Sequence, residues 1–520
     1  MEPLDIMTVK KQSDYFEKDL VSKSLFFSFS LYIRMFLKLI SGIFIAKFLG
    51  PSLFGLKNAY DLALGYESYS NLGTFSALNR QAPLYRGQQN IDKANIAIST
   101  VYTISLTYAS IAAVIIIVVS QIMRYQGYEQ RYIDFAFFFG IMILTGRMIS
   151  FLQTKLKIDQ RFYVLSINQM LYGFTAAIFG VMLVFYFRFR GLLISLLIAD
   201  SICLCYLFLN EKKLPEVKIS LKHYWALLKI GFPMMILFVL LMLLSSVDRT
   251  LILAMISEKA LGYYGIATVA TGVIATIPQA IHNVTIAPIM EKLGRNKNSQ
   301  SIKNYLNDPM LLLAYLLPIL ICCLYFSIHL PINYYLYKYI PSIPVVKILL
   351  IGAYFEAVAT PSLSIALALN KQIRLIIIVL PIVGLNFGLN YMFIKTGWGL
   401  NGVAAGTSIS FFVYFCVIQY FAQLQFKVSF QVFLKRLFII FVPFGYSLII
   451  IFLINTFIEI EIKGILSDIF STILRIVTFI IFYSILIYNM RKQFGSVMLN
   501  SKIVSLLEKI RFRIWREKLC

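Results

Sequence analysis

Apolar runs of about 20 residues alternate with short polar segments along almost the whole chain. Each run is long enough to cross a hydrocarbon layer about 30 Å thick as a helix. No stretch between the runs is long enough to form a separate soluble domain. The pattern predicts an all-α, polytopic membrane protein of about 14 transmembrane helices. We place the spans at 24–48, 57–82, 98–121, 132–154, 162–186, 191–210, 225–254, 262–289, 309–330, 343–369, 374–394, 400–424, 437–458 and 467–489.

The composition agrees with this pattern. Apolar residues make up 59% of the 520 residues and charged residues 14%, whereas a soluble domain is typically about 45–50% apolar and about 25% charged. The formal net charge is +24. In a soluble protein such a charge would indicate nucleic-acid binding. Here the basic residues lie in short loops between apolar runs, so we expect no nucleic-acid partner.

Lys and Arg are distributed unevenly between the two sides of the predicted bundle. One set of alternate connections, together with both termini, carries about thirty Lys and Arg and the other set about nine. Because cytoplasmic loops are enriched in Lys and Arg, residues 1–23 are predicted to be a cytoplasmic N-terminus and residues 490–520 a basic cytoplasmic tail. The basic connections are 83–97, 155–161, 211–224, 291–308, 371–374 and 425–436.

Three sequence matches at nearly one offset indicate an internal repeat. Each match lies at the same place relative to the predicted spans, which makes coincidence less plausible than for any match alone. The matches pair Gly55 with Gly262 (offset 207), Ala82-Pro83 with Ala287-Pro288 (offset 205) and Gly191 with Gly399 (offset 208).

The repeat predicts the domain organisation. Two six-helix lobes, 24–210 and 225–424, are joined by a cytoplasmic linker at 211–224, and two additional transmembrane helices follow in 437–489. Six spans separate equivalent positions, so the two lobes have the same orientation in the membrane. Transporters built in this way hold their substrate between the lobes.

The same residues carry a resemblance to a known family. Ser41-Gly42 with the segment from Ala46 to Gly55 resembles the first-helix signature of oligosaccharide flippases. These flippases belong to the multidrug/oligosaccharidyl-lipid/polysaccharide exporter superfamily. Matching second-half segments are Gly231-Phe-Pro233, Val247-Asp-Arg249, Leu261-Gly-Tyr-Tyr264, Ile277-Pro278 and 398–406.

The resemblance implies a function. Members of the family have fourteen helices in two lobes around a central cavity and act in the bacterial inner membrane. Their usual cargo is a polyprenyl diphosphate that carries an O-antigen, capsule or exopolysaccharide unit. The chain is therefore expected to be a flippase that moves such a lipid-linked oligosaccharide from the cytoplasmic to the outer face by alternating access. Expected partners are the lipid-linked glycan, membrane lipids and other polysaccharide assembly proteins.

Charged residues inside the spans are the candidate functional residues. A charge at the bilayer centre costs about 2.5–3.5 kcal/mol on insertion scales, so it normally faces a cavity or a partner. Arg34 and Lys38 lie one turn apart on one helix face. Since Arg binds phosphate bidentately and Lys acts as a point charge, we predict that Arg34, Lys38, Arg147 and Arg249 contact the diphosphate or nearby sugars.

The sequence allows two roles for the intramembrane carboxylates. They either couple transport to a proton or sodium gradient or pair with the intramembrane cations. These carboxylates are Asp61, Glu67, Asp200, Asp248 and Glu356. The cluster of Asn386, Asn390 and Tyr391 could contact sugar hydroxyls, although hydrogen bonding between helices is the simpler account.

Several other functions fit the sequence less well. A drug exporter of the same superfamily usually has twelve helices, and a peptidoglycan-precursor flippase is a close alternative. A membrane glycosyltransferase or polymerase would need an acidic motif in a large outer loop. The longest outer loop, 331–342, has twelve residues, and its composition is typical of a tyrosine belt at the membrane–water interface. Without a nucleophile–base pair, a P-loop or metal-ligand spacing, we expect no enzyme activity, no cofactor and no metal site.

Overall fold

The computed structural model describes residues 6–211, 213–296, 299–458 and 464–489. The predicted basic tail, 490–520, lies outside these residues. The described part of the chain is helical and contains no strand. Its elements are α1 (Ile6–Glu67), α2 (Thr74–Gly87), α3 (Ile91–Tyr125), α4 (Gln130–Ile158), α5 (Phe162–Asn210), α6 (Leu221–Leu244), α7 (Val247–Met255), α8 (Glu258–Asn296), η1 (Ser299–Ile302), α9 (Asn304–Ser327), α10 (His329–Tyr334), η2 (Tyr337–Tyr339), α11 (Ser342–Ala368), α12 (Gln372–Lys395), α13 (Gly399–Leu424), α14 (Phe430–Phe457) and α15 (Ile465–Asn489).

The predicted number of membrane passes is confirmed. Twelve of the described helices are long and apolar enough to cross a membrane. Unbroken, the 49 residues of α5 would span about 74 Å at 1.5 Å per residue, far more than one bilayer crossing. Both α1 and α5 are interrupted by a residue with non-helical backbone angles, Gly50 and Arg188 respectively, so each makes two passes. The described part of the chain therefore makes fourteen passes.

The chain divides into two compact units, which we describe separately. The boundaries between the units cut through α8, α11 and α13, so each of these helices belongs to both. The lobe boundaries expected from the repeat follow a different division and stay a prediction. The first unit comprises 1–269, 336–345 and 371–410, and the second 270–335, 346–370 and 411–520.

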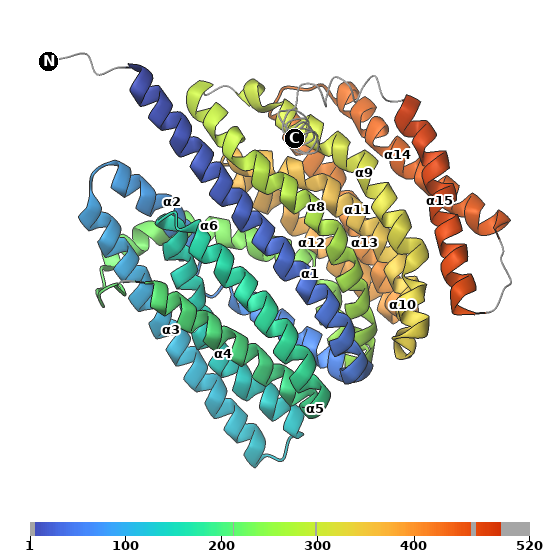
Figure 1. Ribbon diagram of the computed structural model, residues 1–520, viewed down its shortest axis with the longest axis horizontal. Coiled ribbons are helices and arrows are strands. Elements are labelled where there is room, and N and C mark those ends of the chain that lie inside the picture. The colour runs from blue at the N-terminus through green and yellow to red at the C-terminus, as the bar shows by residue number, and fades with distance from the viewer. Residues whose placement is uncertain (1–5, 212, 297–298, 459–463, 490–520) are drawn as a thin grey trace, which may run out of the picture. The chain divides into compact units, whose positions relative to one another are not determined.

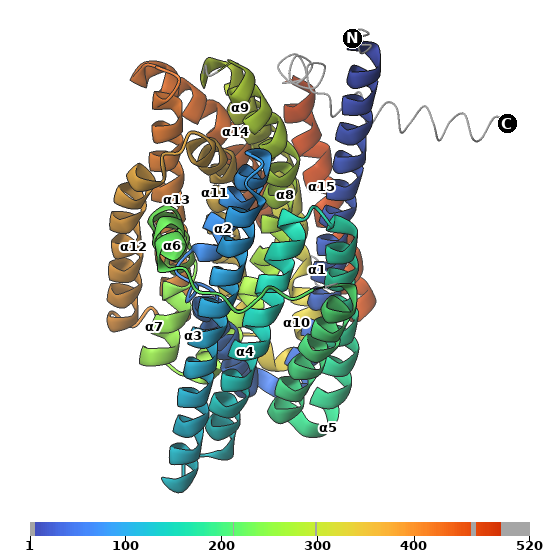
Figure 2. The same ribbon diagram turned by 90° about the vertical axis from the view of Figure 1, so that its left-hand side faces the viewer.

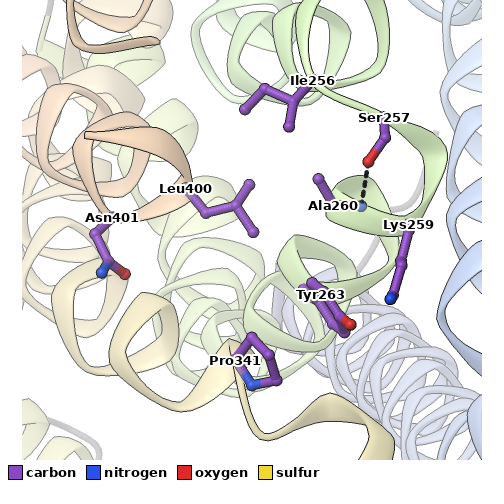
Figure 3. Close-up of a pocket in the computed structure, with 8 residues that line it drawn as sticks. All are labelled: Ile256, Ser257, Lys259, Ala260, Tyr263, Pro341, Leu400 and Asn401. Atoms are coloured by element: carbon purple, nitrogen blue, oxygen red, sulfur yellow. Dashed lines mark hydrogen bonds between the residues drawn. The ribbon is translucent and has the colours of Figure 1, made fainter. Parts of the chain in front are cut away.

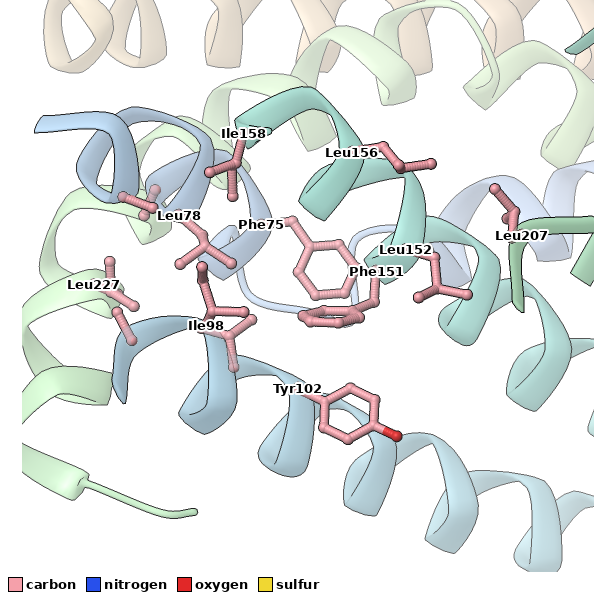
Figure 4. Close-up of a cluster of buried hydrophobic side chains, with 14 of the residues drawn as sticks. Phe75, Leu78, Ile98, Tyr102, Phe151, Leu152, Leu156, Ile158, Leu207 and Leu227 are labelled. Carbon is pink, nitrogen blue, oxygen red and sulfur yellow. The ribbon is translucent and has the colours of Figure 1, made fainter. Parts of the chain in front are cut away.

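Helices α3, α4 and α5 lie side by side in the first unit, and α5 also packs along α1 (Figure 1). Near one end of these helices α2 and α6 join them around a hydrophobic core. Figure 4 shows the rings of Phe75 and Phe151 packed together there, with their centroids 6.2 Å apart. Tyr102 lies on the other side of Phe151, at 4.9 Å. This aromatic contact fixes α2, α3 and α4 against one another.

The first pass ends at a kink whose freed carbonyls are capped by side chains. Gly50 has φ 72° and ψ 172°, a conformation that glycine adopts without steric cost, and a proline follows it. The hydroxyl of Tyr339 donates to the carbonyl of Ala46 (2.7 Å) and the guanidinium of Arg188 donates to the carbonyl of Phe48 (2.5 Å). The last carbonyls of a helix have no partner within the helix, and these two side chains supply donors for them.

The second and seventh passes are broken helices, which the sequence analysis did not predict. In the second pass a turn at residues 68–73 separates the end of α1 from α2. In the seventh pass Ser245 and Ser246 separate α6 from α7. The two passes meet at Gly73 and Gly231, where a methyl group on either glycine would overlap the backbone of the other. The two passes therefore pack backbone against backbone at the point where α2 begins.

Repeat-related residues touch one another reciprocally in the first unit. A methyl group on Gly55 would overlap the carbonyl of Glu258, and one on Gly262 would overlap the carbonyl of Pro51. The offset of 207 relates Pro51 to Glu258 as it relates Gly55 to Gly262, so the two contacts are equivalent. Reciprocal contacts of this kind are expected where a two-fold axis relates the repeats.

In the second unit, the two C-terminal helices pack on the helices that precede them. Helix α9 contacts both α14 and α15 (Figure 2 shows α9 beside α14). The hydroxyl of Tyr483 in α15 donates to the carbonyl of Tyr315 in α9 at 3.0 Å. The ring of Tyr354 in α11 stacks on Phe444 in α14, with centroids 4.3 Å apart. The two additional helices are therefore an integral part of this unit.

The predicted tyrosine belt at 331–342 is only partly correct. This segment contains the short helices α10 and η2, and the side chains of Tyr334 and Tyr337 are exposed. Tyr339 is instead buried, because its hydroxyl caps the kink of α1 and its ring packs edge-on against Phe54. Sequence composition alone does not distinguish an interfacial tyrosine from a buried one whose hydroxyl has a partner.

We expect Gly55→Ala and Gly262→Ala to lower the apparent Tm of the protein in detergent. The added methyl groups would force the crossing backbones apart, and overpacking of this kind typically costs about 1–3 kcal/mol. Gly42→Ala is the matched control, because its methyl group would meet open space and Ala favours a helix over Gly. Equal apparent Tm values for all three variants would contradict the close approach.

Candidate functional site

Arg34 and Lys38 lie on the first pass and face the fifth. The guanidinium of Arg34 donates to the side-chain oxygen of Gln169 and lies 4.3 Å above the centroid of the Tyr172 ring. Both partners belong to α5. Gln169 is buried, whereas the side chain of Lys38 is exposed. Arg34 is therefore held in a fixed orientation by α5.

A third basic residue, Lys57, joins this group from the second pass. Its ammonium group pairs with the carboxylate of Asp61 one turn later, at 2.6 Å. Lys38 interacts electrostatically with Asp61 and Lys57, and also with Arg34. The start of the second pass thus adds one cation and one carboxylate to the cations of the first pass.

Arg249 completes the group from α7. Its guanidinium donates to the carbonyl of Ser245 at 2.9 Å, and it interacts electrostatically with Lys38 and Asp61. The Nε atom of Arg249 is buried and has no hydrogen-bond partner among the described residues. We call Arg34, Lys38, Lys57, Asp61 and Arg249 the cationic cluster.

The cationic cluster contains four cations and one carboxylate, and two further carboxylates border it, Asp200 at Arg34 and Asp248 at Arg249. Cations therefore outnumber carboxylates by four to three. Such an excess inside a membrane is unfavourable unless an anion or water is present. Arg and Lys donors arranged in this way can bind a phosphate or diphosphate through charge-assisted hydrogen bonds. The structure therefore brings together three of the four predicted substrate contacts.

The fourth predicted contact, Arg147, has a protein partner. Its guanidinium is paired with the carboxylate of Glu67 and also donates to the hydroxyl of Ser70. Only 3% of the Arg147 side chain is exposed. These bonds tie α4 to the turn that breaks the second pass. Of the two readings given for Glu67, the geometry corresponds to charge pairing.

The remaining predicted carboxylates lie in different surroundings. Asp200, in the second half of α5, accepts a hydrogen bond from Thr145 at 3.3 Å and interacts electrostatically with Arg34. Glu356 lies in α11 within the second unit, where it interacts electrostatically with Tyr414. Asp200 thus borders the cationic cluster, whereas Glu356 belongs to the other unit.

Asp248 lies in a buried network of oxygen-bearing side chains. It accepts hydrogen bonds from Tyr264 (2.5 Å) and Thr407 (3.4 Å). The amide of Asn390 donates to the hydroxyl of Thr407 (3.3 Å) and to the side-chain oxygen of Asn386 (2.7 Å). The hydrogen bonds join α7, α8, α12 and α13. They agree with the prediction that Asn386 and Asn390 form hydrogen bonds between helices.

This network, which we call the Asp248 network, gathers carboxylate, amide and hydroxyl oxygens beside the break in the seventh pass. The amide of Asn386 donates to the carbonyl of Leu244, where the seventh pass is broken (2.7 Å). The side-chain oxygen of Asn390 is buried without a hydrogen-bond partner. Carboxylate, amide and hydroxyl oxygens suit a hard cation such as Na⁺, and transporters often bind coupling ions at broken helices. No cluster of three or more His, Cys, Asp or Glu side chains suited to a metal occurs in the described part of the chain.

The sequence analysis missed Lys57 and the two residues that hold Arg34. The spacing of Lys57 and Asp61, four residues apart on a helix, is the signal that could have identified the pair. For Gln169 and Tyr172 no comparable signal exists, because they lie on a different pass from Arg34. Their role follows only from the packing of α5 along α1.

Comparison with known proteins agrees with the resemblance noted in the sequence. The model of the polysaccharide biosynthesis protein family matches residues 86–344, about half of the chain. A search of curated protein sequences found no match. Several solved structures have a similar fold although their sequences are less than 20% identical.

One of these structures is a lipid II flippase, MurJ, in an inward closed conformation. It is 19% identical, with a TM-score of 0.65, over 89% of this chain and 100% of that one. An outward-facing multidrug resistance MATE family transporter of the MOP superfamily is 14% identical, with a TM-score of 0.57, over 78% of this chain and 95% of that one. A MOP superfamily transporter from Pyrococcus furiosus is 14% identical, with a TM-score of 0.51 and the same coverage. The chain thus combines a match to the polysaccharide biosynthesis protein family with the fold of the MOP superfamily transporters.

Proposed function

We propose that the protein is a flippase that moves a polyprenyl-diphosphate-linked oligosaccharide from the cytoplasmic to the outer face of a bacterial inner membrane. The cationic cluster is the observation that carries this proposal. A diphosphate diester has two negative charges, which the guanidinium and ammonium groups of the cluster can bind. The match to the polysaccharide biosynthesis protein family supports a glycan as the transported group.

In this proposal the cluster binds the diphosphate while the lipid tail stays in the bilayer. Arg34 and Arg249 would bind diphosphate oxygens through their guanidinium groups, and Lys38 would act as a point charge. Lys57 stays with Asp61 and sets the local charge. Alternating access between the two faces would then carry the bound head group across, with both termini on the cytoplasmic side.

The same charges argue against export of cationic drugs, the second candidate function. Some structures with a similar fold are MATE family transporters, so the fold alone does not separate the two functions. A cationic drug would be repelled by the four basic side chains of the cluster, which outnumber the carboxylates in and beside it. We therefore favour an anionic cargo, delivered for surface polysaccharide synthesis with the help of other assembly proteins.

We also propose that the Asp248 network couples transport to an ion gradient. A sodium ion would fit the oxygen atoms of Asp248, Asn390 and Thr407, and the unpartnered oxygen of Asn390 would gain a ligand. The neighbouring residue Arg249 belongs to the cationic cluster, so an ion at Asp248 and the cargo would influence each other through one short helix, α7. Of the other carboxylates, Asp61 is paired with Lys57 and Glu67 with Arg147, and Asp200 and Glu356 remain candidates for pairing.

We expect Arg34→Ala, Lys38→Ala and Arg249→Ala each to reduce transport at least about tenfold, because each removes a charge-assisted bond to the diphosphate. The measurement uses purified protein in liposomes with a fluorescent polyprenyl-diphosphate oligosaccharide and follows the appearance of label on the opposite leaflet. Arg190→Ala is the control, because the Arg190 side chain is exposed and its ion pair with Asp134 is long, with 3.7 Å between the nitrogen and oxygen atoms. Full transport by all three cluster variants would refute the proposed site.

Arg147 requires a test that separates pairing from cargo binding. We expect Arg147→Ala to lower the apparent Tm strongly, since removing one partner of a buried pair typically costs about 3–5 kcal/mol. The double variant Arg147→Met, Glu67→Leu should recover stability and transport, because no unpaired charge remains. A double variant that is stable but does not transport would instead place Arg147 among the cargo contacts.

For the Asp248 network, we expect Asp248→Asn to abolish the stimulation of transport by an imposed Na⁺ gradient while cargo binding persists. Transport into liposomes would be compared under Na⁺, pH and no gradient. Asp134→Asn is the control, because Asp134 is a buried carboxylate outside the network. If the variant responds to the Na⁺ gradient as the wild type does, the network is not the coupling site.

A further inference from the structure

Three connections that lie far apart in the sequence form a pocket at one end of the first unit. The segment 256–263 follows α7, Pro341 precedes α11, and residues 400–401 begin α13. All three were predicted to face outward from their place in the order of spans. The pocket holds about 370 Å³. Its lining residues include Ile256, Ser257, Lys259, Tyr263, Leu400 and Asn401.

Hydrogen-bond donors dominate the polar part of this pocket. Lys259 forms no ion pair or hydrogen bond with the residues that the structure describes. The hydroxyl oxygen of Ser257 accepts a bond from the backbone N–H of Ala260 at 3.1 Å, which leaves its hydrogen free to donate. Figure 3 shows Lys259 and Tyr263 on one side and Asn401 on the other. The lining contains no carboxylate.

The nearest acid does not neutralise Lys259. Glu258 lies next to it in the sequence, but its carboxylate pairs with Arg131 at 3.0 Å and accepts a bond from the hydroxyl of Tyr132 at 2.6 Å. Both partners belong to α4. The pocket therefore keeps a positive charge and a surplus of donors, which is the chemistry that recognises phosphate oxygens.

The apolar part of the pocket indicates that the phosphate belongs to a lipid. Ile256, Leu400 and Pro341 form apolar walls beside the donors. The neighbouring side chains of Ile340 and Trp398 are 50% and 64% exposed. Exposed aromatic and aliphatic side chains next to a Lys are typical of the membrane–water interface, where lipid head groups lie.

We propose that this pocket binds the phosphate head group of a lipid in the leaflet at this end of the bundle, the outer leaflet in the predicted orientation. Lys259 is the charged contact, Asn401 and Tyr263 donate to the remaining oxygens, and Leu400 contacts the beginning of the lipid tail. The site lies outside the cationic cluster and does not depend on the proposed transport. Its ligand is either an anionic phospholipid or the polyprenyl diphosphate left after the glycan is removed.

Native mass spectrometry of the full chain in detergent tests this proposal. Phosphatidylglycerol, a polyprenyl diphosphate and phosphatidylcholine are added separately at equal concentrations, and inorganic phosphate is then added to each lipid-bound sample at the same concentration. We expect one of the two anionic lipids to bind at least fivefold more than phosphatidylcholine, whose choline cation offsets its phosphate; the lipid bound more strongly is the source. Equal binding of phosphatidylcholine, or complete displacement of the lipid by equimolar inorganic phosphate, would overturn the proposal.

Two variants locate the binding. Lys259→Gln should reduce binding of the preferred lipid at least fivefold, and Leu400→Trp should reduce it by filling the pocket. Lys395→Gln is the matched control, because Lys395 is a basic residue near the same end whose ammonium group lies 5.8 Å from the Tyr391 ring and does not line the pocket. Equal losses in Lys259→Gln and Lys395→Gln would show attraction to surface charge and refute the site. Because binding is read without transport, its failure would leave the proposed flippase function untouched.

Discussion

The hydrocarbon layer offers no hydrogen bonds, so every backbone group freed by a break in a helix needs a partner within the protein. This constraint explains why residues far apart in the sequence meet where the passes bend. Inside the seventh pass, the break after α6 depends on Asn386, whose amide donates to the carbonyl of Leu244. The kink at Gly50, where one pass ends and the next begins, is capped in the same way by Tyr339 and Arg188. The polar side chains in these passes therefore belong to the architecture as well as to the proposed transport.

The same constraint separates structural charges from candidate functional ones. The guanidinium of Arg147 donates hydrogen bonds to the carboxylate of Glu67 and the hydroxyl of Ser70, so its charge is balanced without a ligand. The cationic cluster is not balanced, because its four cations face only three carboxylates, Asp61 within the cluster and Asp200 and Asp248 beside it. A membrane protein tolerates such an imbalance where water or an anion supplies the missing charge. The surplus, more than any single residue, distinguishes this site from the other buried charges.

The sequence predicted the helical passes well because bilayer thickness sets their length, and apolar runs of that length are easy to recognise. It did not predict the breaks at 68–73 and 245–246, since a break becomes visible only when its partners are known. Intramembrane charge identified Arg34, Lys38 and Arg249, which the structure brings together. It did not reveal that Lys57 joins them or that Arg147 faces Glu67, because both depend on how different passes pack.

The reciprocal contact of Pro51 and Gly55 with Glu258 and Gly262 has a consequence for the history of the chain. In a symmetric homodimer, the two copies contact each other through the same surface. A contact from one residue to a second residue of the other copy is therefore always matched by the reverse contact. Asn58 and Gly265, also 207 positions apart, touch each other in the same way. A half-length ancestor could have made these contacts between two identical copies. Gene duplication and fusion would then have preserved an old dimer interface inside one polypeptide, leaving each half free to acquire its own charges.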